Sequence, residues 1–185
     1  WLNAALTKAG MTLKDVELAA LPFDQVAAAL DGGALDASLL GEPLVTLAEQ
    51  RGLVTRLSDD FLTDAQGTVI FYNLSWARAE AALAERWLMA WLRGARDLNG
   101  DGYAQEANAA IIEKYTKVPK DVVRIAKAPR HHPDGTLNLA DMRAQQEFFL
   151  KGGSLTYPDL IDLATIIDTS FAEGAVARLA RHGRG

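Results

Sequence analysis

Residues 30–44 read LDGGALDASLLGEPL and combine a helix end, a short apolar segment and a new helix start. The glycine pair that begins at Gly32 follows an apolar helical pattern and predicts a helix C-cap, because glycine adopts the left-handed backbone conformation cheaply. Residues 37–40 lie between turn residues and are too few for a helix. They favour a strand buried on both faces of a parallel sheet. Pro43 suits the first turn of a helix that we expect to end at Gly52.

Further strand and helix signals flank this stretch. Short apolar segments predict strands at 16–21, 53–57 and 68–73, and the last is the strongest because it is rich in β-branched and aromatic residues. The first 57 residues therefore predict an α/β fold with a small parallel sheet and flanking helices. Beyond the predicted strand at 68–73, we expect the chain to be mainly helical. The predicted helices lie at 2–9, 24–31, 43–51, 76–96, 104–115, 120–126, 139–150 and 170–180.

The composition excludes several classes of function. The 185 residues carry a net charge of −5, which gives no reason to expect nucleic acid or an anionic membrane surface as a partner. The absence of cysteine excludes disulfides, thiolate metal sites and cysteine nucleophiles. Because no run of about eighteen apolar residues is present, the sequence predicts no membrane-spanning helix.

The first candidate ligand site is the loop that joins the strand at 37–40 to the helix after it. Its residues are Leu39, Leu40, Gly41, Glu42 and Pro43. In open α/β sheets, ligands lie beyond the carboxyl ends of strands and against helix N-termini. The alternative is a plain helix start in which the helix dipole favours Glu42. Since Glu42 would compete with an anion for that helix end, electrostatics favours a neutral or cationic ligand.

The end of the strongest predicted strand is the second candidate site. Tyr72, Asn73 and Ser75 offer an aromatic face, an amide and a hydroxyl group, which suit a small polar ring or acid. The alternative is a strand end followed by a helix that Ser75 caps.

Residues 97–103 resemble the first half of a calcium-binding EF-hand loop. Asp97, Asn99, Asp101 and Tyr103 stand at the alternating positions that supply ligands. The twelfth position is Asn108, where such a loop needs a bidentate glutamate, so an acidic turn between helices is the better interpretation. We expect no other metal and no cofactor, because the sequence contains no phosphate loop, dinucleotide fingerprint or nucleophile elbow.

Several segments together resemble a known family. Residues 10–18, residues 30–37, the Glu42-Pro43 pair and residues 139–149 are similar, in order and spacing, to the second lobe of periplasmic substrate-binding proteins. These proteins serve ABC importers for nitrate, sulfonates, taurine and pyrimidine precursors of thiamine. The resemblance implies a type II periplasmic-binding fold, in which two α/β lobes hold the ligand between them. It also implies that most of the first lobe and the signal peptide lie outside this chain.

The resemblance carries further expectations. Residues 1–67 would form the α/β portion of the second lobe, and residues 68–185 a crossing strand and a helical portion that packs against the first lobe. The protein would be periplasmic, would bind a small polar or heteroaromatic molecule and would deliver it to a membrane permease without making or breaking a bond. Apolar surface left without the first lobe would drive self-association into a homo-oligomer.

Two other classes of function share this fold. A thiamine pyrimidine synthase-like enzyme is the alternative to a receptor. Such enzymes use a cysteine-rich segment, however, and this chain has no cysteine. The effector domain of a transcription regulator would need a helix-turn-helix, which the sequence does not show.

Overall fold

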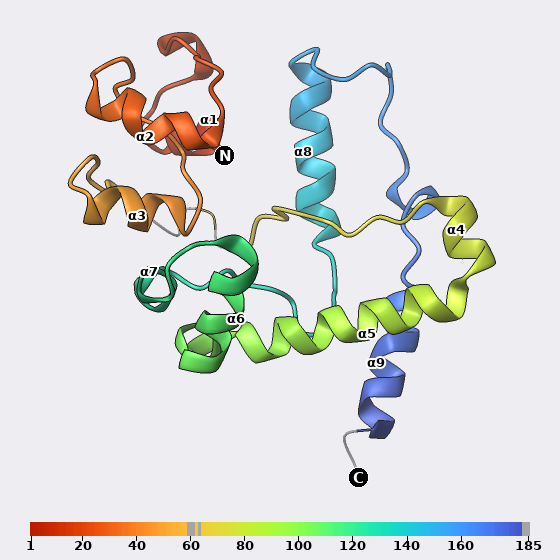
Figure 1. The fold of residues 1–185 in the computed structure, drawn as a ribbon. Helices are drawn as coiled ribbons and strands as arrows, with labels where there is room; N and C mark the ends of the chain where they lie inside the picture. Colours follow the sequence, from red (N-terminus) through yellow and green to blue (C-terminus); the bar gives the residue numbers. More distant parts are fainter. Residues whose placement is uncertain (59–61, 63, 183–185) are drawn as a thin grey trace. The chain divides into compact units, whose positions relative to one another are not determined.

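The computed structural model describes residues 1–58, 62 and 64–182. In that part of the chain every regular element is a helix, and no residue lies in a β-strand (Figure 1). The prediction of an α/β fold with a small parallel sheet is therefore wrong. The partial type II periplasmic-binding fold that the resemblance implies is wrong for the same reason. The expectation of a mainly helical second half agrees with the structure.

The predicted helices are confirmed, most of them within one or two residues of the expected ends. The α-helices are α1 Leu2–Lys8, α2 Phe23–Asp31, α3 Leu44–Gln50, α4 Leu74–Ala79, α5 Ala81–Leu98, α6 Glu106–Thr116, α7 Lys120–Ile125, α8 Leu139–Lys151 and α9 Ser170–His182. The 3-10 helices are η1 Leu13–Asp15, η2 Gly100–Ala104 and η3 Leu163–Thr165. The single helix predicted at 76–96 is two helices, because the backbone at Glu80 leaves helical geometry with φ −120° and ψ 39°.

The four predicted strands are segments without a hydrogen-bonded ladder at 16–21, 37–40, 53–57 and 68–73. The physical reason is that a strand needs a neighbour to pair its N–H and C=O groups, and β-propensity reports the fit to a pleated, half-buried surface rather than a backbone preference. The described residues provide no such neighbour. In the segment with the best strand pattern, Phe71 is 87% exposed.

The chain divides into two compact units, each of which we describe by itself. Unit 1 comprises residues 1–63 and 100–129, and unit 2 comprises residues 64–99 and 130–185. None of the helices that the structure describes is long and apolar enough to cross a bilayer.

Unit 1 has its best packed region around α6, α7 and η2, which contact one another, and α3 contacts α7. Ala109 of α6 and Val123 of α7 are completely buried, and Tyr103 of η2 is also buried. This packing places the start of α3, and with it the predicted loop at 39–43, on the same unit as η2.

Unit 2 is built on the contact between α5 and α9 (Figure 1). Leu88 and Leu92 of α5 form a core cluster with Ala175 and Leu179 of α9. On α5, Leu88 and Leu92 are buried, whereas Leu83 and Trp87 are 42% and 47% exposed.

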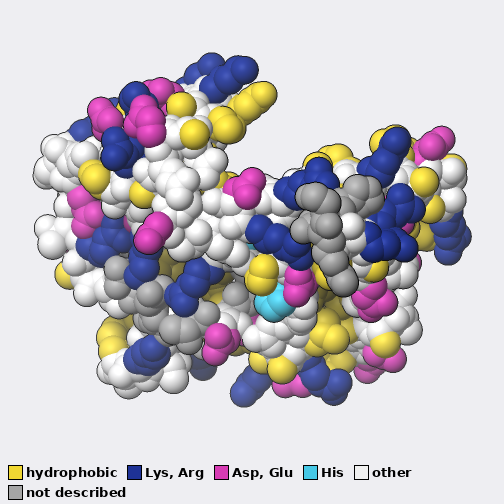
Figure 2. Space-filling view, turned by 90° about the horizontal axis from the view of Figure 1, so that it is seen from below, with side chains coloured by type: hydrophobic (Ala, Val, Ile, Leu, Met, Phe, Trp, Pro, Cys, Tyr) yellow, Lys and Arg dark blue, Asp and Glu magenta, His cyan; other side chains and the backbone are white. Residues whose placement is uncertain are grey.

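Many large apolar side chains are exposed, and Figure 2 shows hydrophobic side chains on the surface among charged ones. On unit 2 they include Val69, Ile70, Phe71 and Leu74, which follow one another along or just after the extended segment. This segment therefore combines exposed apolar side chains with a backbone that is not paired with another strand among the described residues.

Candidate functional site

The predicted loop at 39–43 forms the start of α3. The carbonyl oxygen of Gly41 accepts hydrogen bonds from the backbone N–H groups of Leu44 at 3.1 Å and Val45 at 3.2 Å. Gly41 itself is exposed, and Leu39 and Leu40 are half-buried. The interpretation as a helix start is confirmed by this geometry. α3 has seven residues, so its dipole is small.

The Glu42 side chain is held within unit 1 by two polar partners. Its Oε1 pairs with Nη1 of Arg56 at 2.9 Å, and its Oε2 accepts a hydrogen bond from Oγ1 of Thr46 at 2.6 Å. Arg56 also pairs with Glu49 through Nη2 at 2.7 Å. Hydrogen bonds with Glu49 and then Glu42 raise the pKa of Arg56 above its usual value. Arg56 is shared by two carboxylates, so it offsets only part of their negative charge, but both carboxylate oxygens of Glu42 already have partners within unit 1.

The second half of the calcium-like loop belongs to the same unit. Burial raises the pKa of Tyr103, and the negative charge of Glu42 raises it further. Tyr103 is buried in η2 and the side chain of Asn108 donates to the carbonyl oxygen of Gly102 at 2.9 Å. Both residues therefore stabilise the local turn.

The first half of that loop belongs to unit 2. Nδ2 of Asn99 donates to the backbone oxygen of His131 at 3.0 Å, and Oδ1 of Asn99 accepts from the His131 N–H at 3.4 Å. The amide of Asn99 therefore fixes the 130–135 loop. Among the described residues, no group of three or more histidine, aspartate or glutamate side chains is placed to hold a metal ion.

Tyr72 is the centre of an aromatic cluster in unit 2. Its ring makes edge-to-face contacts with Trp76, Trp87 and Phe171 at centroid distances of 5.4, 5.8 and 5.7 Å. Its hydroxyl donates to the carbonyl oxygen of Ala84 at 3.0 Å, and burial raises its pKa. Tyr72 thus fastens the extended segment to α4, α5 and α9, and its polar atom is already used.

The two polar residues that follow Tyr72 lie at the start of α4. Oδ1 of Asn73 accepts a hydrogen bond from the backbone N–H of Trp76 at 3.0 Å, so Asn73 is the N-cap. Ser75 is exposed within the helix. The cap that the sequence assigned to Ser75 as the alternative interpretation is therefore supplied by Asn73.

A hollow of about 250 Å³ is lined by residues of the extended segment and the residues before it and by residues of α8. It is lined by Gln66, Gly67, Thr68, Val69, Met142 and Gln145. Sequence reasoning did not find these residues. The one local signal is the polar run around Gln145 on α8.

Hydrogen bonds between side chains and backbone link the residues in the wall of this hollow. The N–H of Gln66 donates to Oδ2 of Asp141 at 2.6 Å, and its carbonyl oxygen accepts from Nε2 of Gln145 at 3.0 Å. Nε2 of Gln145 also donates to Oδ2 of Asp141 at 2.6 Å. Nε2 of Gln66 donates to the carbonyl oxygen of Thr68 at 2.7 Å. With its amide hydrogens used in the wall, Gln145 has its Oε1 as the group to offer a ligand.

The remaining wall provides apolar contact and one hydroxyl group. Val69 and Met142 supply the apolar surface, and Thr68 supplies a hydroxyl that can donate or accept. One acceptor, one hydroxyl and a small apolar surface match a compact polar molecule. The hollow and Tyr72 both belong to unit 2, whereas the loop at 39–43 lies on unit 1.

Comparison with known proteins gives one match. The model of a family described as NMT1-like matches residues 1–113 of the chain. No curated protein and no solved structure matches it significantly. The matched residues include the loop at 39–43, residues 66–69 of the hollow and the residues around Tyr72, while α8 lies beyond them.

Proposed function

Because the chain belongs to the NMT1-like family, we propose that it is the solute-binding component of an ABC importer. In this role it captures a small polar or heteroaromatic molecule outside the cytoplasm and delivers it to a membrane permease. The family match over residues 1–113 is the observation that carries the proposal, because this family consists mainly of substrate-binding proteins of such transporters.

We place ligand contacts of unit 2 at the hollow beside the extended segment. Its volume of about 250 Å³ is close to the lower end for small-molecule sites, which start at about 300 Å³. Taurine, nitrate, short sulfonates or a single pyrimidine ring are of this size class. The hydroxyl of Thr68 can donate to an oxygen or nitrogen of these ligands, and Oε1 of Gln145 can accept from the ammonium of taurine or an N–H of a pyrimidine. Asn73 and Ser75 extend the polar surface along the same stretch of chain.

The loop at 39–43 is proposed as a contact of a different kind. Since Arg56 and Thr46 occupy the carboxylate of Glu42, this loop can offer backbone groups of Gly41 and the apolar side chains of Leu39, Leu40 and Pro43. A ligand that contacts this loop therefore does not bind to a free carboxylate of Glu42.

The proposal is tested by thermal shift and calorimetry on the whole chain. The panel contains taurine, nitrate, an alkylsulfonate and a pyrimidine precursor of thiamine. We expect one of them to raise the melting temperature, because a ligand at about 100 times its Kd stabilises the folded state by about 2.7 kcal/mol.

A pair of matched variants locates the binding. Thr68→Val removes the hydroxyl that lines the hollow and keeps the shape, so we expect about tenfold weaker binding, the effect of one lost hydrogen bond. Thr55→Val removes a similarly exposed hydroxyl in unit 1 and should leave the affinity unchanged. The site is contradicted if both variants bind as the original chain does, and the function is contradicted if no member of the panel binds.

A further inference from the structure

Residues 68–73, with the sequence TVIFYN, form an extended segment without a partner strand. The six residues carry no charge, proline or glycine, and three of them are β-branched. Among the described residues, the backbone groups of Val69, Ile70 and Phe71 make no hydrogen bond. A row of unpaired N–H and C=O groups with these side chains is a template for pairing with another strand.

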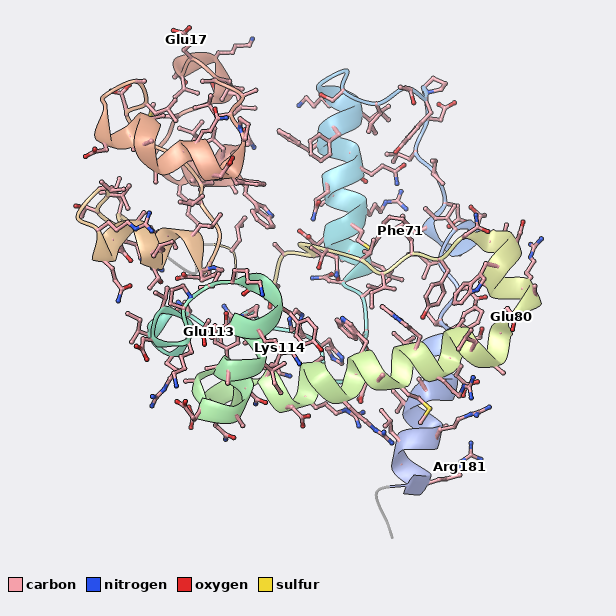
Figure 3. All side chains as sticks on the ribbon, in the orientation of Figure 1. Glu17, Phe71, Glu80, Glu113, Lys114 and Arg181 are labelled. Carbon is pink, nitrogen blue, oxygen red and sulfur yellow. The ribbon has the colours of Figure 1, made fainter. Side chains whose placement is uncertain are left out.

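The side chains of this segment alternate as they do in a strand. Tyr72 packs into the aromatic cluster of unit 2, so its neighbour Phe71 points the other way and is 87% exposed. Val69, two residues earlier, shares the Phe71 side and is also exposed. Figure 3 shows Phe71 on the extended segment, between the α8 and α4 regions of unit 2. The segment therefore has an anchored side and an open apolar side.

We propose that residues 68–73 pair antiparallel with the same residues of a second copy of this chain, centred on Ile70. The two-fold axis of such a pair is normal to the two-stranded sheet, so residues that face each other point to the same side of it. The residue numbers of two facing residues therefore add up to an even sum. Centred on Ile70, Val69 faces Phe71 of the second copy and Thr68 faces Tyr72 of the second copy. Each of these pairs joins a β-branched to an aromatic side chain, the favourable cross-strand combination.

The occupant is a second copy because the segment complements itself. It carries no charge, so pairing with itself places no like charges opposite each other. A register centred on Phe71 is less favourable, since it sets Val69 opposite Asn73 and leaves an apolar side chain against an amide.

The size of the interface sets the strength of the association. One pair of short strands buries less than the ~1,200 Å² that stable interfaces need. We therefore expect a weak, concentration-dependent dimer. Thr68 and Val69 also line the proposed ligand hollow, but association is measured without a ligand, so failure of this inference is distinguishable from failure of the proposed function.

The absence of cysteine allows a clean test. In Ile70→Cys the two sulfur atoms of a dimer centred on Ile70 face each other, at the Cα separation of about 5.5 Å or less that a disulfide accepts. Ile166→Cys is the matched control: it is the same substitution in unit 2, at a side chain that is 64% exposed against 39% for Ile70. On mild oxidation we expect Ile70→Cys to form covalent dimers at least about tenfold faster than Ile166→Cys, because random collision would favour the more exposed site.

Two further measurements complete the test. Sedimentation of the unmodified chain should show a dimer fraction that rises with concentration, and Val69→Pro, which removes a pairing N–H, should lower it. A chain that stays monomeric, or a dimer in which Ile166→Cys cross-links as fast as Ile70→Cys, overturns the proposal. Faster cross-linking of Phe71→Cys than of Ile70→Cys overturns the register.

Discussion

The contact between Gly174 and Glu85 shows how one missing side chain shapes the α5 and α9 pair. A Cβ built on Gly174 would lie 3.0 Å from Cδ and 3.1 Å from Oε1 of Glu85. Glu85 is held there by Nε of Arg178, at 2.5 Å from Oε1. Gly174 therefore provides the space in which an ion pair between two helices of unit 2 can form.

We predict that Gly174→Ala destabilises the chain by about 1 kcal/mol. Alanine gains about 1 kcal/mol in helix propensity over glycine, but its methyl group overpacks against the held carboxylate, which costs about 1–3 kcal/mol. In a Glu85→Ala background the clash is absent, and the same substitution should stabilise by up to about 1 kcal/mol. Urea unfolding of the four members of this cycle measures the change of sign.

Gly94 in α5 is the control for helix propensity. A Cβ there meets nothing within 4 Å, so Gly94→Ala should stabilise the chain in both backgrounds. A Gly174→Ala variant that is as stabilising as Gly94→Ala with Glu85 present would refute the account of the glycine.

At the scale of elements, the extended segment keeps its place without a sheet because Tyr72 joins it to three helices. Tyr72→Phe keeps the ring and removes the hydrogen bond to Ala84, so we predict a loss of about 1 kcal/mol. Tyr72→Ala also removes the three ring contacts and should cost about 2–3 kcal/mol, less than for a fully buried aromatic residue. Fluorescence of the neighbouring tryptophans during urea unfolding reports both losses.

Tyr115, which is 76% exposed, is the matched control. Tyr115→Phe should change the unfolding free energy by less than about 0.5 kcal/mol, as surface substitutions do. Equal effects of the two Tyr→Phe substitutions would mean that the Ala84 hydrogen bond contributes nothing.

The same segment shows why helices were predictable and strands were not. A helix satisfies its hydrogen bonds within itself, so apolar spacing and end signals such as Pro119 before α7 and Gly152 after α8 locate it from sequence. The strand pattern at 68–73 states only that these side chains suit a pleated surface. Whether a ladder forms depends on a partner strand, and that information is not in the segment.

At the scale of the whole molecule, the candidate sites were predicted in part for a related reason. The helix start at 41–43 follows from local signals, whereas the sequence offered Tyr72 as a ligand contact and did not indicate its ring contacts with Trp87 and Phe171. The hollow does not, because Gln66 and Gln145 are 79 residues apart in sequence and meet through a hydrogen bond. Likewise, nothing in the sequence near Glu42 indicates that its side chain pairs with Arg56.

The division into two units predicts that stability is not shared evenly along the chain. Leu92 is completely buried in the α5 and α9 core of unit 2, so Leu92→Ala should cost about 2–5 kcal/mol. Because each unit buries its own side chains, we expect faster amide hydrogen exchange in α5 and α9 but unchanged protection in α6 and α7. Val123→Ala, at a completely buried position of α7, should give the reverse pattern. If either variant accelerated exchange equally in all four helices, the two units would unfold as one cooperative body.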